Sequence, residues 1–587
     1  MRSEFITHLT EFRKIRYRWA FIPVICALVA AALYLGLSKP ASYNMHFHIK
    51  PVFSEENMLQ VNLKITNLHL DKDRYLELNC GDISIGDVSC TDSSGKSIPY
   101  EKGQGLFRIY PGGKHTVEIL YSVKLGVSGK HGHRGGIYED MVVFDGGEVF
   151  MLPSEAYAGS DQEIKESIKS VCFSFDVPED WVKVTPFDRI NHPTWHQFYI
   201  LKDTCFAFGR MEKKEYTKGN TSFNVYVDSK NKYSYNSEAE EGLNALYDYY
   251  ASLFGYNVPD FSIVLLRENP QDGIYIIGGA SARSIGTTFN PNNPRDWQLM
   301  GHRMFHAFFD AKIHSRVFHV PPQLWFYEGL ATYYENMSMG SLPEELISRL
   351  ELEPPKLFGM LFKQFLYMKF KDPALLSLAP MNEEKIANYP ARMEFLHYYQ
   401  APLIVKAMED ISCTNTNTCN RILEYIIENS DSEDMLSMDR IINYSLGEQG
   451  LEFVSKYLLS DEIPPLWYLG EGAGENSKHV VEGLNFAEYN IWSWVSQEIE
   501  GYPLDMITID KIDQPGIWKE FDKVYFADEH IEEKIKEFSP TVYFCLKIYA
   551  LRSYVCEVDY NDPLLRIKIL TDEANIKKWE DWLSKIQ

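Results

Sequence analysis

The chain lacks the clusters of basic side chains that nucleic-acid binding requires. Its 82 Asp and Glu outnumber its 58 Lys and Arg, so the formal net charge is −24, and closely spaced basic residues occur only near the amino terminus. Because phosphate binding depends on such clusters, we exclude nucleic acid as a partner. Low-complexity tracts and internal repeats are also missing. The 45% hydrophobic and 14% aromatic content is that of a folded chain, and a length of 587 residues predicts several domains.

Cysteine is scarce, and no two cysteines have the C-x-x-C spacing, which argues against a zinc ribbon or a thioredoxin-like site. Apart from Cys26 in the apolar amino-terminal segment, the cysteines fall into pairs that are close in sequence. Proximity alone predicts that these pairs form disulfides in an oxidising compartment. The predicted pairs are Cys80 with Cys90, Cys172 with Cys205, Cys413 with Cys419, and Cys545 with Cys556.

Only one apolar run is long enough to cross a bilayer. Residues 19–38, WAFIPVICALVAAALYLGLS, contain no charged side chain and predict a transmembrane helix. It is preceded by four basic residues, Arg13, Lys14, Arg16 and Arg18. By the positive-inside rule, residues 1–18 form a cytoplasmic tail and the rest is extracytoplasmic. A cleaved signal peptide is the alternative, but no convincing small-x-small site follows the run. We therefore predict a single-pass protein of the cell membrane.

The rest of the chain predicts an α+β protein. Residues 43–235 alternate apolar and polar side chains, as in Tyr43 to Ile49, which predicts an antiparallel, sandwich-like β domain. Residues 236–340 change to the helical period and also contain two buried strands. Residues 341–460 are predominantly helical, and residues 461–587 mix short strands with a terminal helix.

Candidate metal ligands occur at helical spacing near the middle of the chain. Asn293 and Pro294 open a predicted helix that runs to about Lys312. His302 and His306 are four residues apart, so both project from one face, where they are able to bind a single Zn²⁺. The next helix supplies Glu328 as a third ligand, and Glu335, two turns further on, as an acid that orients a ligating histidine.

This stretch resembles a known family. H-x-x-x-H followed by WFYEGLATYYE is similar to the gluzincin metallopeptidases, especially the glycyl aminopeptidase family and more distantly the aminopeptidase N family. The resemblance extends over about residues 106–408. It implies a thermolysin-like catalytic domain at 236–340, with His302, His306 and Glu328 as zinc ligands, and a helical domain at 341–460 that walls the cleft. Tyr399 stands where the family has a tyrosine that stabilises the oxyanion, although Ala401-Pro402 replaces the lysine-glycine beside it.

The chain departs from the family at two functional positions. Arg303 replaces the glutamate general base, and a guanidinium stays protonated at working pH, so it cannot accept a proton. Gly278 and Gly279 match the family's substrate-edge segment, but Ser281 stands where that segment has the glutamate that recognises a substrate amine. We therefore predict a pseudopeptidase that binds peptide or protein amino termini. A working zinc aminopeptidase with unconventional proton transfer is the alternative.

Other interpretations of the same residues stay open at this point. The two histidines are also compatible with an ordinary helix core. Arg303 is able to replace the metal by pairing with Glu328 or Glu335, or to swing out of the site and leave zinc bound. Asp310, one turn past His306, is a weak candidate for a substitute base because it points along the helix rather than at the metal.

Overall fold

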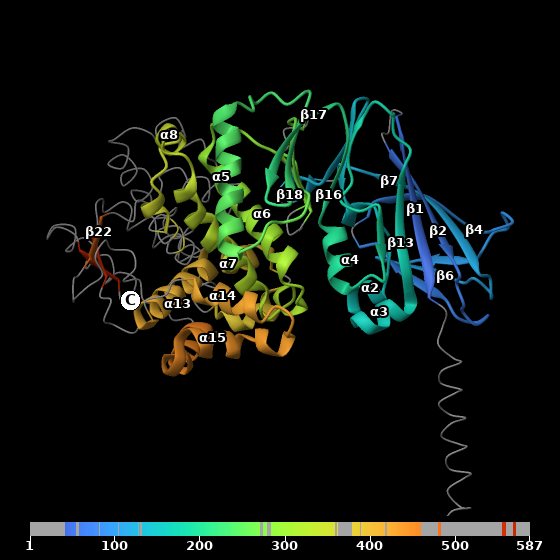
Figure 1. Cartoon of the computed structure of the whole chain (residues 1–587). Helices are drawn as coiled ribbons and strands as arrows, with labels where there is room; N and C mark the ends of the chain where they lie inside the picture. The colour runs from blue at the N-terminus through green and yellow to red at the C-terminus, as the bar shows by residue number, and fades with distance from the viewer. Residues whose placement is uncertain are drawn as a thin grey trace, which may run out of the picture.

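The computed structural model describes residues 42–459, apart from gaps at 54–57, 82, 104, 127, 130–131, 270–273, 279–282, 359–360, 362–364, 366–377, 388 and 417–419, together with three short strands nearer the carboxyl terminus. Figure 1 shows β-sheets at one end of the molecule and helices at the other. The predicted cytoplasmic tail (1–18) and transmembrane helix (19–38) lie outside the described residues. Among the helices that the structure does describe, none is both long enough and apolar enough to cross a membrane.

Three sheets form the amino-terminal β domain. The largest has the order β15-β13-β1-β2-β7-β4, and its strands are β1 (Tyr43–Val52), β2 (Met58–Thr66), β4 (Ile85–Asp92), β7 (Thr116–Lys124), β13 (Ile168–Phe175) and β15 (Arg189–Asn191). Apolar and polar side chains alternate along these strands as predicted. In β1, the odd-numbered residues from Tyr43 to Ile49 are buried and the side chains between them are more exposed. Its strands are antiparallel as predicted, except that β1 and β13 run parallel.

Two smaller sheets and three helices complete the β domain. The sheet β12-β3-β6-β5 contains β3 (Leu76–Asn79), β5 (Tyr100–Lys102), β6 (Leu106–Ile109) and β12 (Leu152–Pro153). The sheet β10-β11-β16-β14 contains β10 (Gly135–Tyr138), β11 (Met141–Asp145), β14 (Val182–Val184) and β16 (Cys205–Gly209). The helices are α2 (Glu155–Ala158), α3 (Asp161–Ser167) and α4 (Trp195–Lys202), and a short hairpin is formed by β8 (Ser128–Gly129) and β9 (Gly132–His133).

Two of the predicted disulfides are wrong, because Cys80, Cys90, Cys172 and Cys205 are free thiols. Phe173 and Phe206 contact each other between two sheets, with ring centroids 6.2 Å apart. Neighbouring side chains on a strand point to opposite faces, so Cys172 and Cys205 both face away from this contact and cannot meet. Cys80 follows β3 and Cys90 lies on β4, in different sheets.

The other two predicted disulfides are only partly within the structure. Cys413 is disulfide-bonded, but its predicted partner Cys419 lies outside the described residues. The pair Cys545 and Cys556 is not described either. These two pairings stay predictions.

A five-stranded sheet forms the centre of the second domain. Its order is β17-β18-β19-β21-β20, with β17 (Met211–Lys218), β18 (Thr221–Asp228), β19 (Phe261–Leu266), β20 (Ile276–Ile277) and β21 (Ser284–Thr288). β18, β19 and β21 are parallel, while β20 lies antiparallel at the edge. β17 and β18 belong to this sheet, although they lie before the boundary at residue 236 that the sequence pattern predicts. That hairpin has the same period of two as the β domain, so the sequence pattern hides the change of sheet.

Three helices pack beside this sheet, and a second group of helices forms the helical region that follows. The sheet is accompanied by α5 (Ser237–Phe254), α6 (Pro294–Lys312) and α7 (Leu324–Ser338). The helical region contains α8 (Glu344–Arg349), α11 (Glu383–Ile386), α12 (Pro390–Phe395), the π-helical turn η6 (Leu396–Gln400), α13 (Ala401–Thr416), α14 (Arg421–Glu428), α15 (Met438–Leu446), α16 (Gly450–Phe453) and the π-helical turn η9 (Val454–Leu458). Of residues 461–587, the structure describes one small sheet with β22 (His479–Glu482), β23 (Val555–Val558) and β24 (Ile567–Leu570).

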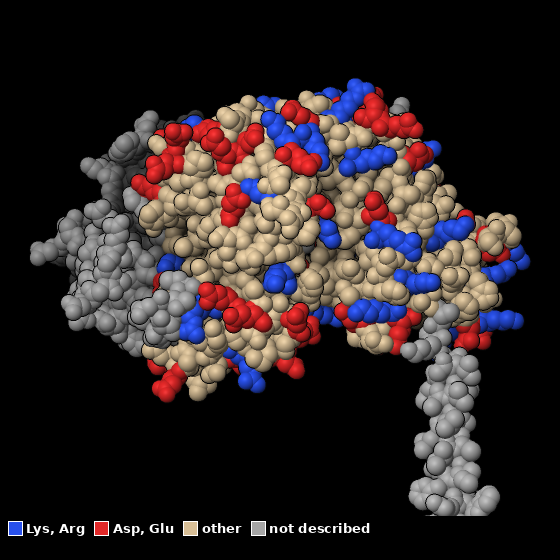
Figure 2. All heavy atoms as spheres, viewed as in Figure 1, with Lys and Arg blue, Asp and Glu red and all other residues tan. Residues whose placement is uncertain are grey.

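Charged side chains of both signs are interspersed on the face shown in Figure 2. Lys and Arg lie mostly over the β domain, and Asp and Glu are frequent along the edges of the helical part. This face therefore carries no continuous basic surface of the kind that tracks a phosphate backbone.

Candidate metal centre

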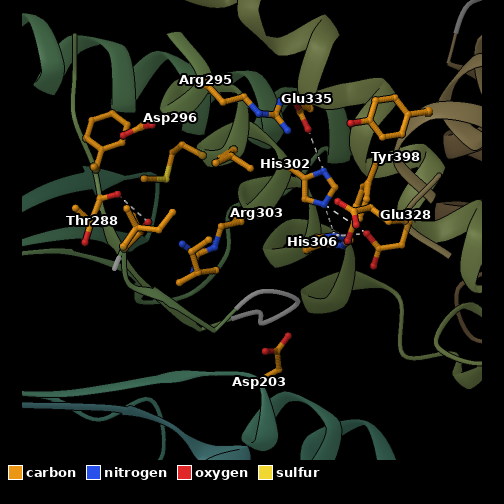
Figure 3. A pocket seen from close by; sticks show the side chains of 18 of the residues that line it. Asp203, Thr288, Arg295, Asp296, His302, Arg303, His306, Glu328, Glu335 and Tyr398 are labelled. Carbon is orange, nitrogen blue, oxygen red and sulfur yellow. Dashed lines mark hydrogen bonds and ion pairs between the residues drawn. The ribbon is translucent and has the colours of Figure 1, made fainter. Parts of the chain in front are cut away.

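The helix α6 carries two of the candidate ligands, and its limits agree with the prediction. The Asn293 side chain accepts the backbone N–H of Arg295 at 3.1 Å, and Pro294 occupies the first helical position. The helix ends at Lys312. His302 and His306 lie on one face, with their Nε2 atoms 3.0 Å apart. The next helix, α7, packs against this face and brings Glu328 to the same point (Figure 3).

Both distances from Glu328 to the histidines have the spacing that a tetrahedral metal requires, and the 3.0 Å between the two histidine Nε2 atoms is slightly shorter. Glu328 Oε2 lies 3.4 Å from His302 Nε2 and 3.5 Å from His306 Nε2. Zinc bonds of about 2.0–2.2 Å at tetrahedral angles place neighbouring donors roughly 3.3–3.6 Å apart. Glu328 Oε2 also has no hydrogen-bond partner in the described structure, although it is buried. The donor set and its geometry therefore fit zinc, with His302, His306 and Glu328 as the ligands.

Glu335 occupies the orienting position that the sequence assigned to it. Its Oε2 lies 3.1 Å from Nδ1 of His302, on the side of the ring that faces away from the other ligands. Its second oxygen accepts from Nη1 of Arg295 at 2.6 Å. Sequence reasoning missed Arg295, which lies two turns before His302 on α6 and has no motif to mark it.

Burial and charge act in opposite directions on the ligands. Burial lowers the pKa of His302, but the carboxylates of Glu328 and Glu335 outweigh it and raise this pKa to about 9. Burial raises the pKa of Glu328, yet His306 and His302 together hold it well below the ordinary value. The three groups thus favour a positive charge at their centre, which a metal ion supplies when it binds.

Arg303 turns away from these ligands (Figure 3). Its Nη2 donates to the backbone oxygens of Ile277 at 2.5 Å and Gly286 at 3.2 Å, and also to that of Gly278. The side chain is buried, and within the described structure it forms no ion pair with Glu328 or Glu335. The alternative in which Arg303 replaces the metal is therefore wrong. Burial lowers the pKa of Arg303 to about 10, which leaves it protonated at neutral pH.

Tyr398, the neighbour of the predicted Tyr399, is a tyrosine that faces the ligands. Its ring centroid lies 5.8 Å from that of His302, and the charge of Glu328, together with burial, raises its pKa. Tyr399 also lines the cavity but stacks on Phe395. The π-helical turn η6, closed by the N–H of Ala401 bonding to Leu396, inserts one residue per turn and so changes which side chain faces the site.

The ligands open onto a cavity of about 520 Å³ between the β domain, the edge of the five-stranded sheet and the helical domain. Besides the metal centre, it is lined by Asp203, Asp296, Glu394 and apolar side chains such as Leu299 and Ile276. Of the predicted substrate-edge residues, Gly278 has a positive φ of 66° that favours glycine. Gly279 and Ser281 lie outside the described residues.

Asp310 is not part of this cavity. It is fully buried, accepts the Tyr327 hydroxyl at 2.8 Å, and lies 3.3 Å from Nε2 of His319. These contacts point it away from the open side of the metal centre, so it does not replace the missing base.

Comparison with known proteins defines the fold. No protein-family model and no curated protein matches the sequence. Among solved structures, an aminopeptidase N family protein from Idiomarina loihiensis is 14% identical, with 72% of this chain and 77% of that chain covered and a TM-score of 0.56. An M1 zinc metallopeptidase from Deinococcus radiodurans is 10% identical, covers 74% and 95% of the two chains, and has a TM-score of 0.40. The first of these likenesses shows that the chain has the aminopeptidase N fold.

Proposed function

We propose that this chain, which has the aminopeptidase N fold, is a membrane-anchored extracytoplasmic pseudopeptidase that binds zinc and the amino termini of peptides or proteins. One observation carries the proposal. Three ligands keep the spacing of a zinc site while the side chain at the position of the general base, Arg303, is cationic and bonded to backbone oxygens. The site therefore retains the residues for binding and lacks the residue for proton transfer.

The chemistry of the remaining groups supports the absence of efficient hydrolysis. Bound zinc would act as a Lewis acid, but peptide hydrolysis also needs an acceptor for the proton of the attacking water. Arg303 is protonated, Asp310 faces Tyr327, and Glu335 is bonded to His302 and Arg295. Loss of a positioned base costs a factor of roughly 100 to 10,000 in rate.

The charge of the cavity favours an amino terminus over a carboxyl terminus. Asp203, Asp296 and Glu394 line it in addition to the acids at the metal centre. The two arginines that line it bond to Glu335 and to backbone oxygens. The acidic side chains of this surface attract a cationic α-amine. They repel a terminal carboxylate.

Metal analysis combined with peptide binding tests this proposal. We expect one zinc per chain in the purified ectodomain, and binding of a tripeptide with a free amino terminus that is lost when the terminus is acetylated. His302→Ala should lose the zinc. Equal binding of the free and acetylated tripeptides would contradict the proposal, as would a wild-type protein that binds no zinc under conditions where a zinc peptidase does.

The second candidate function is an active zinc aminopeptidase, and two observations favour it. The ligand set is intact, and Tyr398 faces the ligands in a position suited to stabilising an oxyanion. Hydrolysis that follows zinc occupancy and is lost in both His302→Ala and Tyr398→Phe would establish this candidate in place of the pseudopeptidase.

The membrane anchor is a further part of the proposal. It depends on the uncharged run at 19–38 and the basic residues before it, because the free thiols remove most of the cysteine argument for export. We expect the full chain to sediment with membranes, and external protease to degrade the domains after residue 42 in intact cells. Protection from that protease, or release of the full chain by salt, would contradict the anchor or its orientation.

A further inference from the structure

Arg303 makes three buried hydrogen bonds. A residue that had merely replaced the general base, with no role of its own, would not need them. One nitrogen, Nη2, donates to the backbone oxygens of Ile277, Gly278 and Gly286. These residues belong to the end of β20 and the middle of β21, the two strands that form the wall of the cavity opposite the metal ligands. The guanidinium therefore joins α6 to the edge of the sheet.

Gly278 and Gly286 also pack closely against Cys205 of the β domain. A Cβ at Gly278 would lie 2.9 Å from the backbone nitrogen of Cys205, and a Cβ at Gly286 would lie 2.7 Å from its Sγ. Ser284 adds a hydrogen bond from its hydroxyl to the Cys205 carbonyl at 2.6 Å. The edge of the sheet is thus enclosed between the β domain and Arg303, with no room for a larger side chain.

The chemistry of arginine suits this place. A buried backbone oxygen without a donor is costly, and Gly278 lies just past the last residue of the edge strand β20. A glutamate at position 303 would add negative charge beside these oxygens, whereas the guanidinium supplies N–H donors. Its buried charge also lies in the field of Asp203 and Asp145 from the β domain.

We propose that Arg303 is a positioning residue that holds the end of β20 and the middle of β21 against the β domain and thereby fixes the wall of the cavity on which a ligand lies. The substitution at this position has replaced a catalytic role with a structural one. The expected effect of Arg303 on peptide binding rests on the proposed function. The expected effect of Arg303 on the order of β20 and β21 does not.

Arg303→Met tests the inference, because methionine keeps an apolar stem and removes every donor. We expect backbone amides in β20 and β21 to exchange with solvent at least tenfold faster, and the dissociation constant for the free tripeptide to rise at least fivefold. Zinc content and exchange in α5 should be unchanged. Ile442→Ala, a buried substitution on α15, is the control for a general loss of stability and should leave both strand exchange and peptide affinity as in the wild type.

Two further variants keep the test decisive. If Arg303→Met does not fold, Arg303→Lys serves instead, since its shorter side chain keeps the charge but reaches the three oxygens less well; we expect an intermediate increase in exchange. Arg303→Glu should loosen the strands even if it gains hydrolysis. Strand exchange within twofold of the wild type in a folded Met or Lys variant would overturn the inference. If the wild type binds no peptide but strand exchange is still faster in Arg303→Met, the inference about the strands stands and the proposed function alone is refuted.

Discussion

Each nitrogen of His302 has a defined role at the metal centre. Its Nε2 faces Glu328 and the second histidine, while its Nδ1 lies 3.1 Å from Glu335. A carboxylate on the far side of a ligating imidazole fixes which nitrogen carries the proton and strengthens the ring as a ligand. Arg295 holds that carboxylate in place. We therefore expect the affinity for zinc to depend on two residues, Glu335 and Arg295, that would not touch the metal.

Glu335→Gln tests this dependence at a single residue. We expect zinc affinity to fall by about 10–100-fold, the usual cost of losing such a partner, because the amide holds neither the His302 ring nor Arg295 as a carboxylate does. Competition with a chelator measures the change. Glu344→Gln, in the exposed first turn of α8, is the matched control and should leave the affinity unchanged. An unchanged affinity in Glu335→Gln would show that Glu335 does not orient His302.

At the scale of elements, the sequence was sufficient for the two ligand helices. Asn293, Pro294 and the spacing of His302 and His306 identified α6, because caps and a period of 3.6 are local properties. The direction of the Arg303 side chain was not predictable, since it depends on backbone oxygens of β20 and β21 that are remote in sequence. The approach of Tyr398 to the ligands was not predictable for a related reason, because a π-helical turn leaves no clear mark in the sequence.

The π-helical turn gives a prediction with a built-in control. Tyr398→Phe should weaken binding of a zinc-chelating peptide hydroxamate by about tenfold, because it removes a hydroxyl beside the ligands that is able to donate a hydrogen bond worth roughly 1.5 kcal/mol. Tyr399→Phe should change the affinity by less than about twofold, because its ring stacks on Phe395 and not beside His302. Calorimetric titration of both variants makes the measurement. The reverse order of effects would restore the assignment to Tyr399.

The junction of α13 and α14 predicts a dependence of stability on pH. Glu409 is buried, one of its oxygens has no partner in the described structure, and burial raises its pKa from the usual value of 4.5 to about 7. A carboxyl with a raised folded-state pKa stabilises the fold fully below its unfolded pKa, and this contribution is lost as the pH rises through 7. Its loss is worth up to about 3 kcal/mol.

Glu409→Gln should remove that dependence. We expect the variant to match the wild type near pH 4.5 and to exceed its free energy of unfolding at pH 8 by an amount of that order, measured by urea unfolding at both pH values. Glu424→Gln, which is exposed on α14, should follow the wild type at both. A variant that is less stable than the wild type at pH 8 would contradict the assignment of an unfavourable charge to Glu409.

At the scale of the whole molecule, an ion cluster ties the first two domains together. Arg267, just after β19, bonds Asp228 through Nε at 2.5 Å and through Nη2 at 2.7 Å. Its Nη1 reaches Asp140 of the β domain at 2.9 Å. The arginine is 7% exposed and Asp228 is 2% exposed, so removing the arginine leaves a buried carboxylate without this partner.

Arg267→Met should destabilise the protein by about 3–5 kcal/mol, the cost of breaking a buried pair from one side. We also expect calorimetry to resolve two transitions where the wild type shows coupled unfolding of the β domain and its neighbour. Lys230→Met removes an exposed partner of the same Asp140 and should cost less than about 1 kcal/mol. Equal effects of the two substitutions would show that the junction does not depend on the buried pair.

We propose above that the molecule binds zinc through His302, His306 and Glu328 and does not turn substrate over. The direct measurement is the rate of hydrolysis of amino-terminal glycyl and alanyl reporter substrates by the zinc-loaded ectodomain, compared with His302→Ala at equal concentration. We expect one zinc per chain in the wild type and the same rate of hydrolysis, at background level, for both proteins. Turnover by the wild type that is abolished in His302→Ala would contradict it.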